Sequence, residues 1–292
     1  MATEPRKILS ELRSPVLVAA FEGWNDAGEA ATSSVEHLSL FWNAEQVCEV
    51  AADDYYDFQV NRPTVRLVDG VSRRIDWPTT AFSYCTPPGA DHDLLLVRGI
   101  EPNFRWRAFV DEIAEVAEIA GVTSAVMLGS MLTDTPHTRP VPVSGSAFSA
   151  EAAKRYRLSE SQYEGPTGIT GVLRDRLVAA GVPSVSLWAA VPHYISSAAN
   201  PKATLALLRR LEEVLDLEIP LDQLPTRVAE WEHTVDEMTG EDEDMAAYIR
   251  QLEAQDDATS TDPDALPEID GEQLAADFER YLRRRDSGSG PA

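Results

Sequence analysis

The sequence predicts an α/β fold, in which a mostly parallel β-sheet is flanked by helices and followed by a C-terminal helical extension. Short apolar runs rich in Val, Leu and Ala alternate with helical stretches over residues 1–210. The hydrophobic and charged fractions, 43% and 25%, are those of a globular protein. Because continuously apolar strands are typical of sheets covered on both faces, we expect parallel strands with right-handed crossovers.

The elements follow in order from the positions of apolar residues. The expected strands, apolar runs bounded by turn residues, are 14–21, 46–52, 64–69, 80–85, 93–99, 124–131 and 183–191. The expected helices, where apolar residues recur at helical spacing, are 27–42, 104–121, 169–181 and 203–215. Asp26 stands where a helix cap belongs, and Gly121 where a helix ends. The polar, aromatic stretch 53–63 is expected to be a loop or a sheet edge.

The pattern changes after the predicted core domain, residues 1–220. Heptad-spaced apolar residues over 221–254 predict a long helix or a helical hairpin, packed on its own domain or on a partner. The acidic, proline-containing stretch 255–268 is expected to be a flexible linker. Residues 269–285 are expected to form a last helix, and 286–292 a disordered tail.

Charge and apolar runs exclude several classes of protein. The formal net charge is −24, and the part from residue 211 onward holds 24 acidic residues against 6 basic ones. Such a chain repels phosphate backbones, so we expect no nucleic-acid partner. No apolar run reaches the roughly 18–20 residues of a membrane span, and we recognise no signal peptide. Two cysteines, Cys48 and Cys85, fit a reducing compartment, so the expected location is the cytoplasm.

None of the common catalytic motifs is present in the sequence. There is no phosphate-binding P-loop, no dinucleotide-binding GxGxxG and no GxSxG serine motif. The five histidines have no HExxH spacing, and there is no CxxC pair. We therefore expect no metal and no cofactor.

Four polar, aromatic or glycine-rich segments lie where predicted strands end or helices begin: residues 21–28, 128–140, 163–171 and 191–196. In open α/β sheets, ligands bind beyond the carboxyl ends of the strands, so these segments are expected to meet at one rim. The candidate ligand-binding residues are Trp24, Asn25, Asp26, Thr133, Asp134, Gly165, Thr167, Gly168 and His193.

Chemistry at that rim would depend on a few side chains. Asp26, Asp134, His137 and His193 are the acid–base candidates. The glycine-rich segment that includes Thr167 could hold an anion at a helix N-terminus. In the alternative reading, the same residues are structural: Asp26 caps a helix, the prolines and glycines form tight turns, and the histidines hydrogen-bond within the fold.

Four segments together resemble the actinobacterial branch of the proteasome assembly chaperone 2 family. They are FEGWNDAGEAA, LGSMLTDTPHTRP, YEGPTGITGVL and WAAVPHYISSAANPKATLALL, and the resemblance spans about residues 14–215. It implies an α/β fold like that of nucleoside phosphorylases, a homotrimer, and a link to proteasome assembly. Most bacterial members of the family have no assigned activity.

Two functions from different classes follow. The first is a non-enzymatic, oligomeric assembly or interaction protein, with proteasome subunits as its partners. The second is an enzyme or sensor for a nucleoside-like or glycoside-like small molecule, with its pocket at the carboxyl edge of the sheet.

Overall fold

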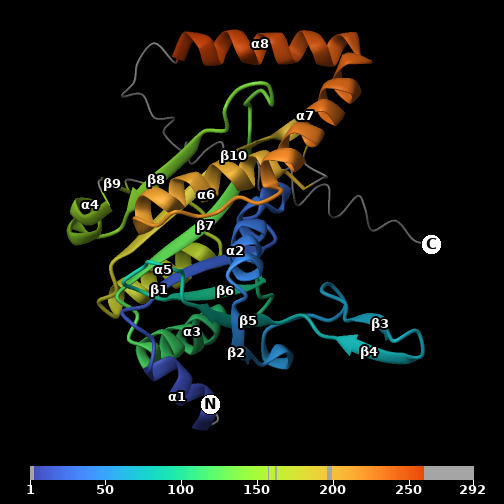
Figure 1. Ribbon diagram of the computed structural model, residues 1–292. Helices are drawn as coiled ribbons and strands as arrows, with labels where there is room; N and C mark the ends of the chain where they lie inside the picture. Colours follow the sequence, from blue (N-terminus) through green and yellow to red (C-terminus); the bar gives the residue numbers. More distant parts are fainter. Residues whose placement is uncertain (1–2, 157, 162, 196–198, 260–292) are drawn as a thin grey trace.

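The computed structural model describes residues 3–156, 158–161, 163–195 and 199–259 (Figure 1). Its centre is an eight-stranded sheet in the order β2-β5-β6-β1-β7-β10-β8-β9. Strands β6 (Leu94–Ile100), β1 (Val16–Glu22), β7 (Ser124–Thr133) and β10 (Ser184–Pro192) are parallel neighbours. The prediction of a mostly parallel sheet flanked by helices is therefore confirmed.

The outer strands add antiparallel pairs at both edges. On one side, β5 (Thr80–Cys85) runs antiparallel to β6, and β2 (Glu45–Val50) runs antiparallel to β5. On the other side, β8 (Val143–Ala147) runs antiparallel to β10 and pairs with the short β9 (Ser159–Glu160). The parallel strands thus lie in the middle, where helices cover both faces.

Helices form a layer on each face. The first layer contains α2 (Ala30–Phe41) and α6 (Pro201–Leu215), and the second contains α3 (Trp106–Ala120) and α5 (Ile169–Ala179), with α1 (Thr3–Ser10) beside α3. Strand β1 serves both layers. Its residues Val16, Val18 and Ala20 join the α2–α6 core, while the alternate residues Leu17, Ala19 and Phe21 join the α3–α5 core. This double burial explains the continuous apolar run.

One helix boundary, the end of α3, lies where the sequence predicts it, and another, the start of α2, lies three residues later. Gly121 ends α3 in the left-handed conformation with φ of 67°, as expected from its position. The helix predicted over 27–42 begins later, at Ala30, because a 3₁₀ turn, η1 (Ala27–Glu29), precedes it. Two further 3₁₀ turns are η2 (Ala52–Asp54) and η3 (His193–Ile195).

Several short elements were not expected from the sequence. They are α1, β4 (Ser72–Asp76), β8, α4 (Ala150–Tyr156) and β9. They are short or polar, so they carry little hydrophobic periodicity, and the body of the protein fixes their conformation.

The C-terminal extension is two helices, α7 (Leu224–Gly240) and α8 (Glu243–Thr259), and α8 turns away from the direction of α7 (Figure 1). The carboxylate of Asp242 accepts hydrogen bonds from the amides of Asp244 and Met245 and so caps α8. Because α8 continues to Thr259, the flexible linker predicted over 255–268 is wrong for its first five residues. Residues 260–292, with the predicted last helix and tail, lie outside the described residues. No helix in the described part is long and apolar enough to cross a membrane.

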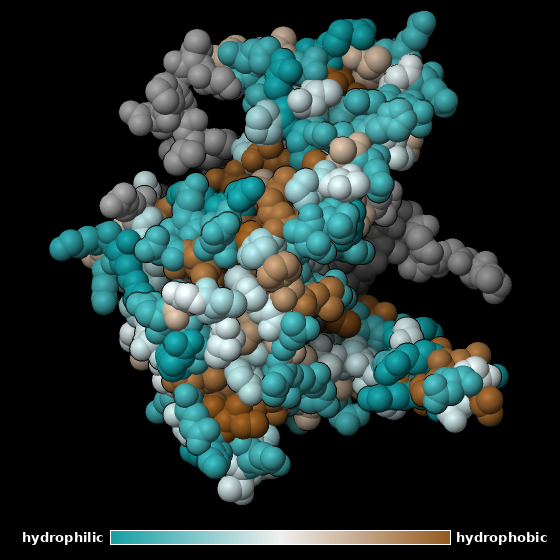
Figure 2. All heavy atoms as spheres, viewed as in Figure 1, coloured by the Kyte–Doolittle hydropathy of each residue, from teal (hydrophilic) through white to brown (hydrophobic). Residues whose placement is uncertain are grey.

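A two-stranded hairpin of β3 (Thr64–Val68) and β4 projects from the body (Figure 1). We define residues 60–77 as the arm. Apolar side chains remain exposed on it (Figure 2), namely Val60, Val65, Leu67, Val71, Ile75 and Trp77.

Gly99 in β6 is predicted to be intolerant of any side chain. A Cβ at Gly99 would lie 2.7 Å from the Cα of the fully buried Thr80 on the neighbouring strand. We expect Gly99→Ala to lower the free energy of unfolding by about 1–3 kcal/mol. The matched control is Gly240→Ala in the last turn of α7, where a Cβ meets nothing within 4 Å and a gain of about 0.4–1 kcal/mol is expected. Urea unfolding measures both, and equal effects would contradict the packing described here.

Candidate functional site

Three of the four polar segments follow β1, β7 and β10, which are parallel and end at one edge of the sheet. The remaining segment leads into α5, and its first helical residue, Ile169, lies at the same edge beside Glu101. The loop after β1 is attached to β7: the amide of Ser130 donates to the carbonyl of Asn25 at 2.8 Å, and the Ser130 hydroxyl donates to the carbonyl of Ala27. The side chains of the four segments fall into two groups.

The first group is centred on Glu101, which follows β6. One carboxylate oxygen, Oε1, accepts a hydrogen bond from the backbone amide of Ile169 at 2.8 Å and from the side-chain amide of Asn25 at 3.0 Å. The carbonyl oxygen of the Asn25 side chain accepts from the Thr170 hydroxyl at 3.3 Å. Asn25 is fully buried, so this group links the ends of β1 and β6 to the start of α5.

This arrangement puts the protein's own carboxylate where the sequence suggested an anion site. Ile169 is the first residue of α5, and Glu101 binds its amide at the positive end of the helix dipole. Burial raises the pKa of Glu101, and the two hydrogen bonds to its ionised form oppose that shift. Gly168 is needed beside this group, since a Cβ there would lie 2.7 Å from Cγ of Asn25.

Two more helices at the same edge are capped by the chain itself. The Asp26 carboxylate accepts from the amides of Ala31, at 2.8 Å, and Thr32, at 3.2 Å, and from the Thr32 hydroxyl. Asp26 therefore caps α2 across the 3₁₀ turn, as the structural reading of the sequence predicted. The side chain of Asn200 accepts from the amide of Ala203 and caps α6. Internal side chains thus bind the N-termini of α2, α5 and α6.

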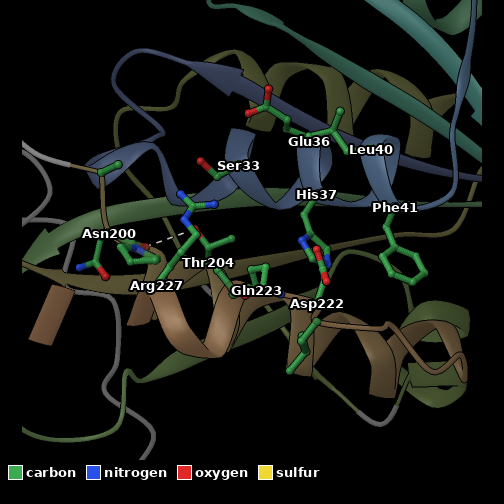
Figure 3. Close-up of a pocket in the computed structure, with 14 residues that line it drawn as sticks. Ser33, Glu36, His37, Leu40, Phe41, Asn200, Thr204, Asp222, Gln223 and Arg227 are labelled. Atoms are coloured by element: carbon green, nitrogen blue, oxygen red, sulfur yellow. Dashed lines mark hydrogen bonds between the residues drawn. The ribbon is translucent and has the colours of Figure 1, made fainter. Parts of the chain in front are cut away.

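Away from these caps, the structure contains a cleft between α2, α6 and the start of α7 (Figure 3). Its volume is about 480 Å³. Leu40 and Phe41 line it at the end of α2, and Glu36, Asp222 and Arg227 are its charged residues. The ring of His37 lies at its wall, with Nε2 2.7 Å from the carbonyl oxygen of Pro220. None of the candidate ligand-binding residues predicted from the sequence lines this cleft.

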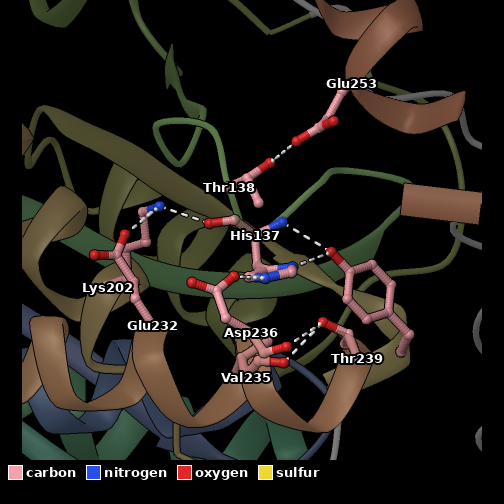
Figure 4. A network of polar contacts seen from close by, with 9 residues as sticks. His137, Thr138, Lys202, Glu232, Val235, Asp236, Thr239 and Glu253 are labelled. Atoms are coloured by element: carbon pink, nitrogen blue, oxygen red, sulfur yellow. Dashed lines mark hydrogen bonds and ion pairs between the residues drawn. The ribbon is translucent and has the colours of Figure 1, made fainter. Parts of the chain in front are cut away.

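The second group surrounds His137, which is buried after β7 (Figure 4). The hydroxyl of Tyr194 accepts from the His137 amide at 2.8 Å and lies 2.8 Å from Nδ1 of the ring. The other ring nitrogen, Nε2, lies 3.0 Å from the Asp236 carboxylate on α7. When Nε2 donates to Asp236, Nδ1 can accept from the Tyr194 hydroxyl. Burial raises the pKa of Tyr194 to about 12, so its hydroxyl keeps the proton at neutral pH.

Ion pairs tie the same loop to both C-terminal helices. Lys202 on α6 donates to the carbonyl of His137 at 2.6 Å and pairs with Glu232 on α7 at 2.7 Å. Arg139 forms a bidentate pair with Asp257 on α8. Together with the contact between His137 and Asp236, these bonds hold α7 and α8 against the loop that leaves β7.

The predicted rim residues are therefore only partly brought together. Asp134 and His193 meet, with 3.0 Å between a carboxylate oxygen and Nδ1, and both are partly exposed. Trp24 is half-buried, and the hydroxyl of Thr133 is buried without a hydrogen-bond partner.

The glycine-rich segment before α5 is divided. Gly165 and Thr167 are exposed, and only Gly168 packs against Asn25. Within the described ranges, no group of three or more His, Cys, Asp or Glu residues is placed to hold a metal ion.

Sequence reasoning missed several residues of both groups. Glu101 directly follows β6, so the rule on strand ends could have identified it. Lys202, Glu232 and Asp236 lie 65 to 99 residues from His137 along the chain, and no motif spacing connects them.

Asp26 provides a pH-dependent test of the first capping contact. Burial raises the pKa of Asp26, and the hydrogen bonds from Thr32 and Ala31 oppose the shift. The folded state therefore holds the proton to higher pH than the unfolded chain does, so the stabilising contribution of Asp26 is greatest below its ordinary pKa and falls as the pH rises through the raised value. Asp26→Asn keeps an acceptor for the two amides but does not titrate.

We expect the free energy of unfolding of wild type to fall relative to Asp26→Asn as the pH rises from about 4, the ordinary pKa of an aspartate, through the raised pKa of Asp26. Asp26→Ala, which loses the cap, should cost about 0.5–2 kcal/mol. Urea unfolding across this pH range measures the effect, with the exposed Asp53→Asn as control. A difference that does not vary with pH would contradict the account.

Comparisons with known proteins identify a family that the chain matches. A model described as the PAC2 family matches residues 20–239. A PAC2 family protein from Streptomyces avermitilis is 53% identical, with coverage of 80% of this chain and 99% of the other and a TM-score of 0.75. A proteasome-assembly chaperone homologue from Mycobacterium tuberculosis is 54% identical, with the same coverages and a TM-score of 0.73.

A more distant structure shares the fold. It is an archaeal proteasome activator from Pyrococcus furiosus, 17% identical over 78% of this chain and 94% of the other, with a TM-score of 0.62. No curated protein sequence matches the chain. The family match spans most of the sequence and includes both groups described above, and on that basis this chain belongs to the PAC2 family.

Proposed function

We propose that the protein is a non-enzymatic, homo-oligomeric assembly protein of the cytoplasm that binds proteasome subunits, with a trimer as its assembled form. The observation that carries this proposal is the 54% identity, over 80% of the chain, to a proteasome-assembly chaperone homologue. The family resemblance of the sequence supports the same conclusion.

The geometry of the sheet edge supports a binding role over a catalytic one. The side chains best suited to acid–base chemistry have structural partners: Asp26 caps α2, and His137 is held between Tyr194 and Asp236. Buried groups that are fully hydrogen-bonded stabilise a fold, and they have no free position for a substrate.

The C-terminal helices offer a surface that suits a protein partner. Residues 224–259 contain eleven acidic residues and two arginines, and most of the acidic side chains are exposed. Charge of one sign on an exposed surface speeds association with a partner of opposite charge and disfavours other partners. We assign the contact with proteasome subunits to this acidic surface of α7 and α8.

A small-molecule site at the sheet edge is the second candidate. The observation in its favour is the pair of Asp134 and His193, which is 3.0 Å apart and partly open to solvent. An acid and a base at this distance can exchange a proton.

The proposed function is tested by capturing purified proteasome α and β subunits, free and as assembled rings, on the immobilised full-length protein. We expect binding to at least one of these forms. Binding to none of them would remove the proposal.

A matched pair of variants tests the assigned surface. Glu241→Gln, Glu243→Gln and Asp244→Asn, combined in one chain, neutralise exposed acidic residues at the junction of α7 and α8. We expect capture to weaken markedly and to become less sensitive to salt, because the removed charges attract the partner at long range. Glu115→Gln with Glu118→Gln, exposed on α3, is the control and should bind as wild type does. Equal loss in both variants would contradict the assignment.

A further inference from the structure

The arm is an amphipathic ribbon whose apolar face has no cover in the described structure. In the register of the hairpin, Val65 pairs with Ile75 and Leu67 pairs with Arg73. Because side chains alternate between faces, Val65, Leu67 and Ile75 share one face. Each is more than half exposed.

The opposite face of the arm is polar and internally paired. Arg66 and Arg74 both form ion pairs with Asp76 there. A ribbon of two strands alone is marginally stable in water, so an exposed apolar face on it indicates a binding surface.

The cleft of Figure 3 is a second surface of the chain with exposed apolar side chains. Among the described residues, ten large apolar side chains are exposed, and six of them are on the arm. Two of the other four, Leu40 and Phe41, are neighbours at the end of α2 and line the cleft, where Leu40 is 71% exposed. Apart from the arm itself, the cleft thus holds the one adjacent pair of exposed large apolar residues in the described part of the chain.

The charges of the arm and of the cleft are also complementary. The arm contains four arginines and two aspartates in a chain whose formal net charge is −24. One of these arginines, Arg73, is on the apolar face of the arm, and the cleft presents Glu36 and Asp222 against the single Arg227. An apolar face that ends in an arginine is therefore complementary to an apolar patch bordered by carboxylates.

The arm projects away from its own body (Figure 1), which leaves its apolar face free for another molecule. We propose that the apolar face of the arm of one copy docks in the α2–α6–α7 cleft of a second copy. The two surfaces are different, so the contact is heterologous, and repeating it closes a ring or continues as a chain. This inference names the contact through which copies of the protein would self-associate. It rests on the homo-oligomeric part of the proposed function and does not depend on the binding of proteasome subunits.

The test is the size of the full-length protein in sedimentation velocity as a function of concentration. Wild type should self-associate. Leu67→Glu on the arm and Leu40→Lys in the cleft should each weaken self-association at least about tenfold, because each places a charge in an apolar contact. Met238→Lys, an exposed apolar residue of α7 outside both surfaces, is the control and should not change the size.

Mixing the two variants separates this geometry from the alternatives. The variant Leu67→Glu keeps an intact cleft, and Leu40→Lys keeps an intact arm, so an equimolar mixture should form mixed dimers although each variant alone is monomeric. Arms that pair with each other would instead leave Leu40→Lys as large as wild type, and that result would overturn the proposal. A wild type that is monomeric at every concentration would also overturn it.

Two measurements keep the test decisive. Thermal unfolding confirms that each variant folds, and Ile75→Gln and Phe41→Ser serve as second variants of the arm and the cleft if the first pair is unstable. Capture of proteasome subunits by a monomeric wild type would reject this docking surface and leave the binding role in place.

Discussion

Helix N-termini at the carboxyl edge of a parallel sheet carry unpaired amides and the positive end of a dipole, which is why such edges bind anions. In this protein, Asp26 supplies the acceptor for α2, Glu101 for α5 and Asn200 for α6. Burial makes the two carboxylates costly, as their raised pKa values indicate, and the hydrogen bonds offset that cost. The arrangement of the rest of the edge depends on these caps, because they fix the loops after β1 and β6 and the start of α5.

The C-terminal helices complete the closure of this edge. In the loop after β7, His137 contacts Asp236 on α7, and Arg139 pairs with Asp257 on α8. Part of the acidic charge of these helices is therefore used in contacts within the molecule. Most of the other acidic side chains of α7 and α8 are exposed. The protein thus has a sheet edge at which three helix N-termini are capped by its own side chains, and it also has an exposed acidic surface. That combination supports the binding role proposed above.

The sequence was sufficient for the central strands and the helices that cover them, but not for the short outer elements or the site. Continuous apolar runs located the central strands, since burial on both faces dictates their composition, and Gly121 marked the end of α3 correctly. The capping role of Asp26 was also predictable, because it depends on a few neighbouring residues. The partners of His137 were not, since Asp236 and Lys202 reach it through tertiary packing. For the same reason, the sequence could suggest an anion site before α5 but could not reveal that Glu101 fills it.

Backbone NMR during titration with inorganic phosphate tests most directly whether internal side chains occupy the helix N-termini at this edge. The amides of Ala31, Ile169 and Ala203 report on the N-termini of α2, α5 and α6. If internal acceptors occupy these amides, their resonances stay in place while phosphate is added to high concentration. Saturable shifts of these amides would show that the edge binds anions, and would contradict the account.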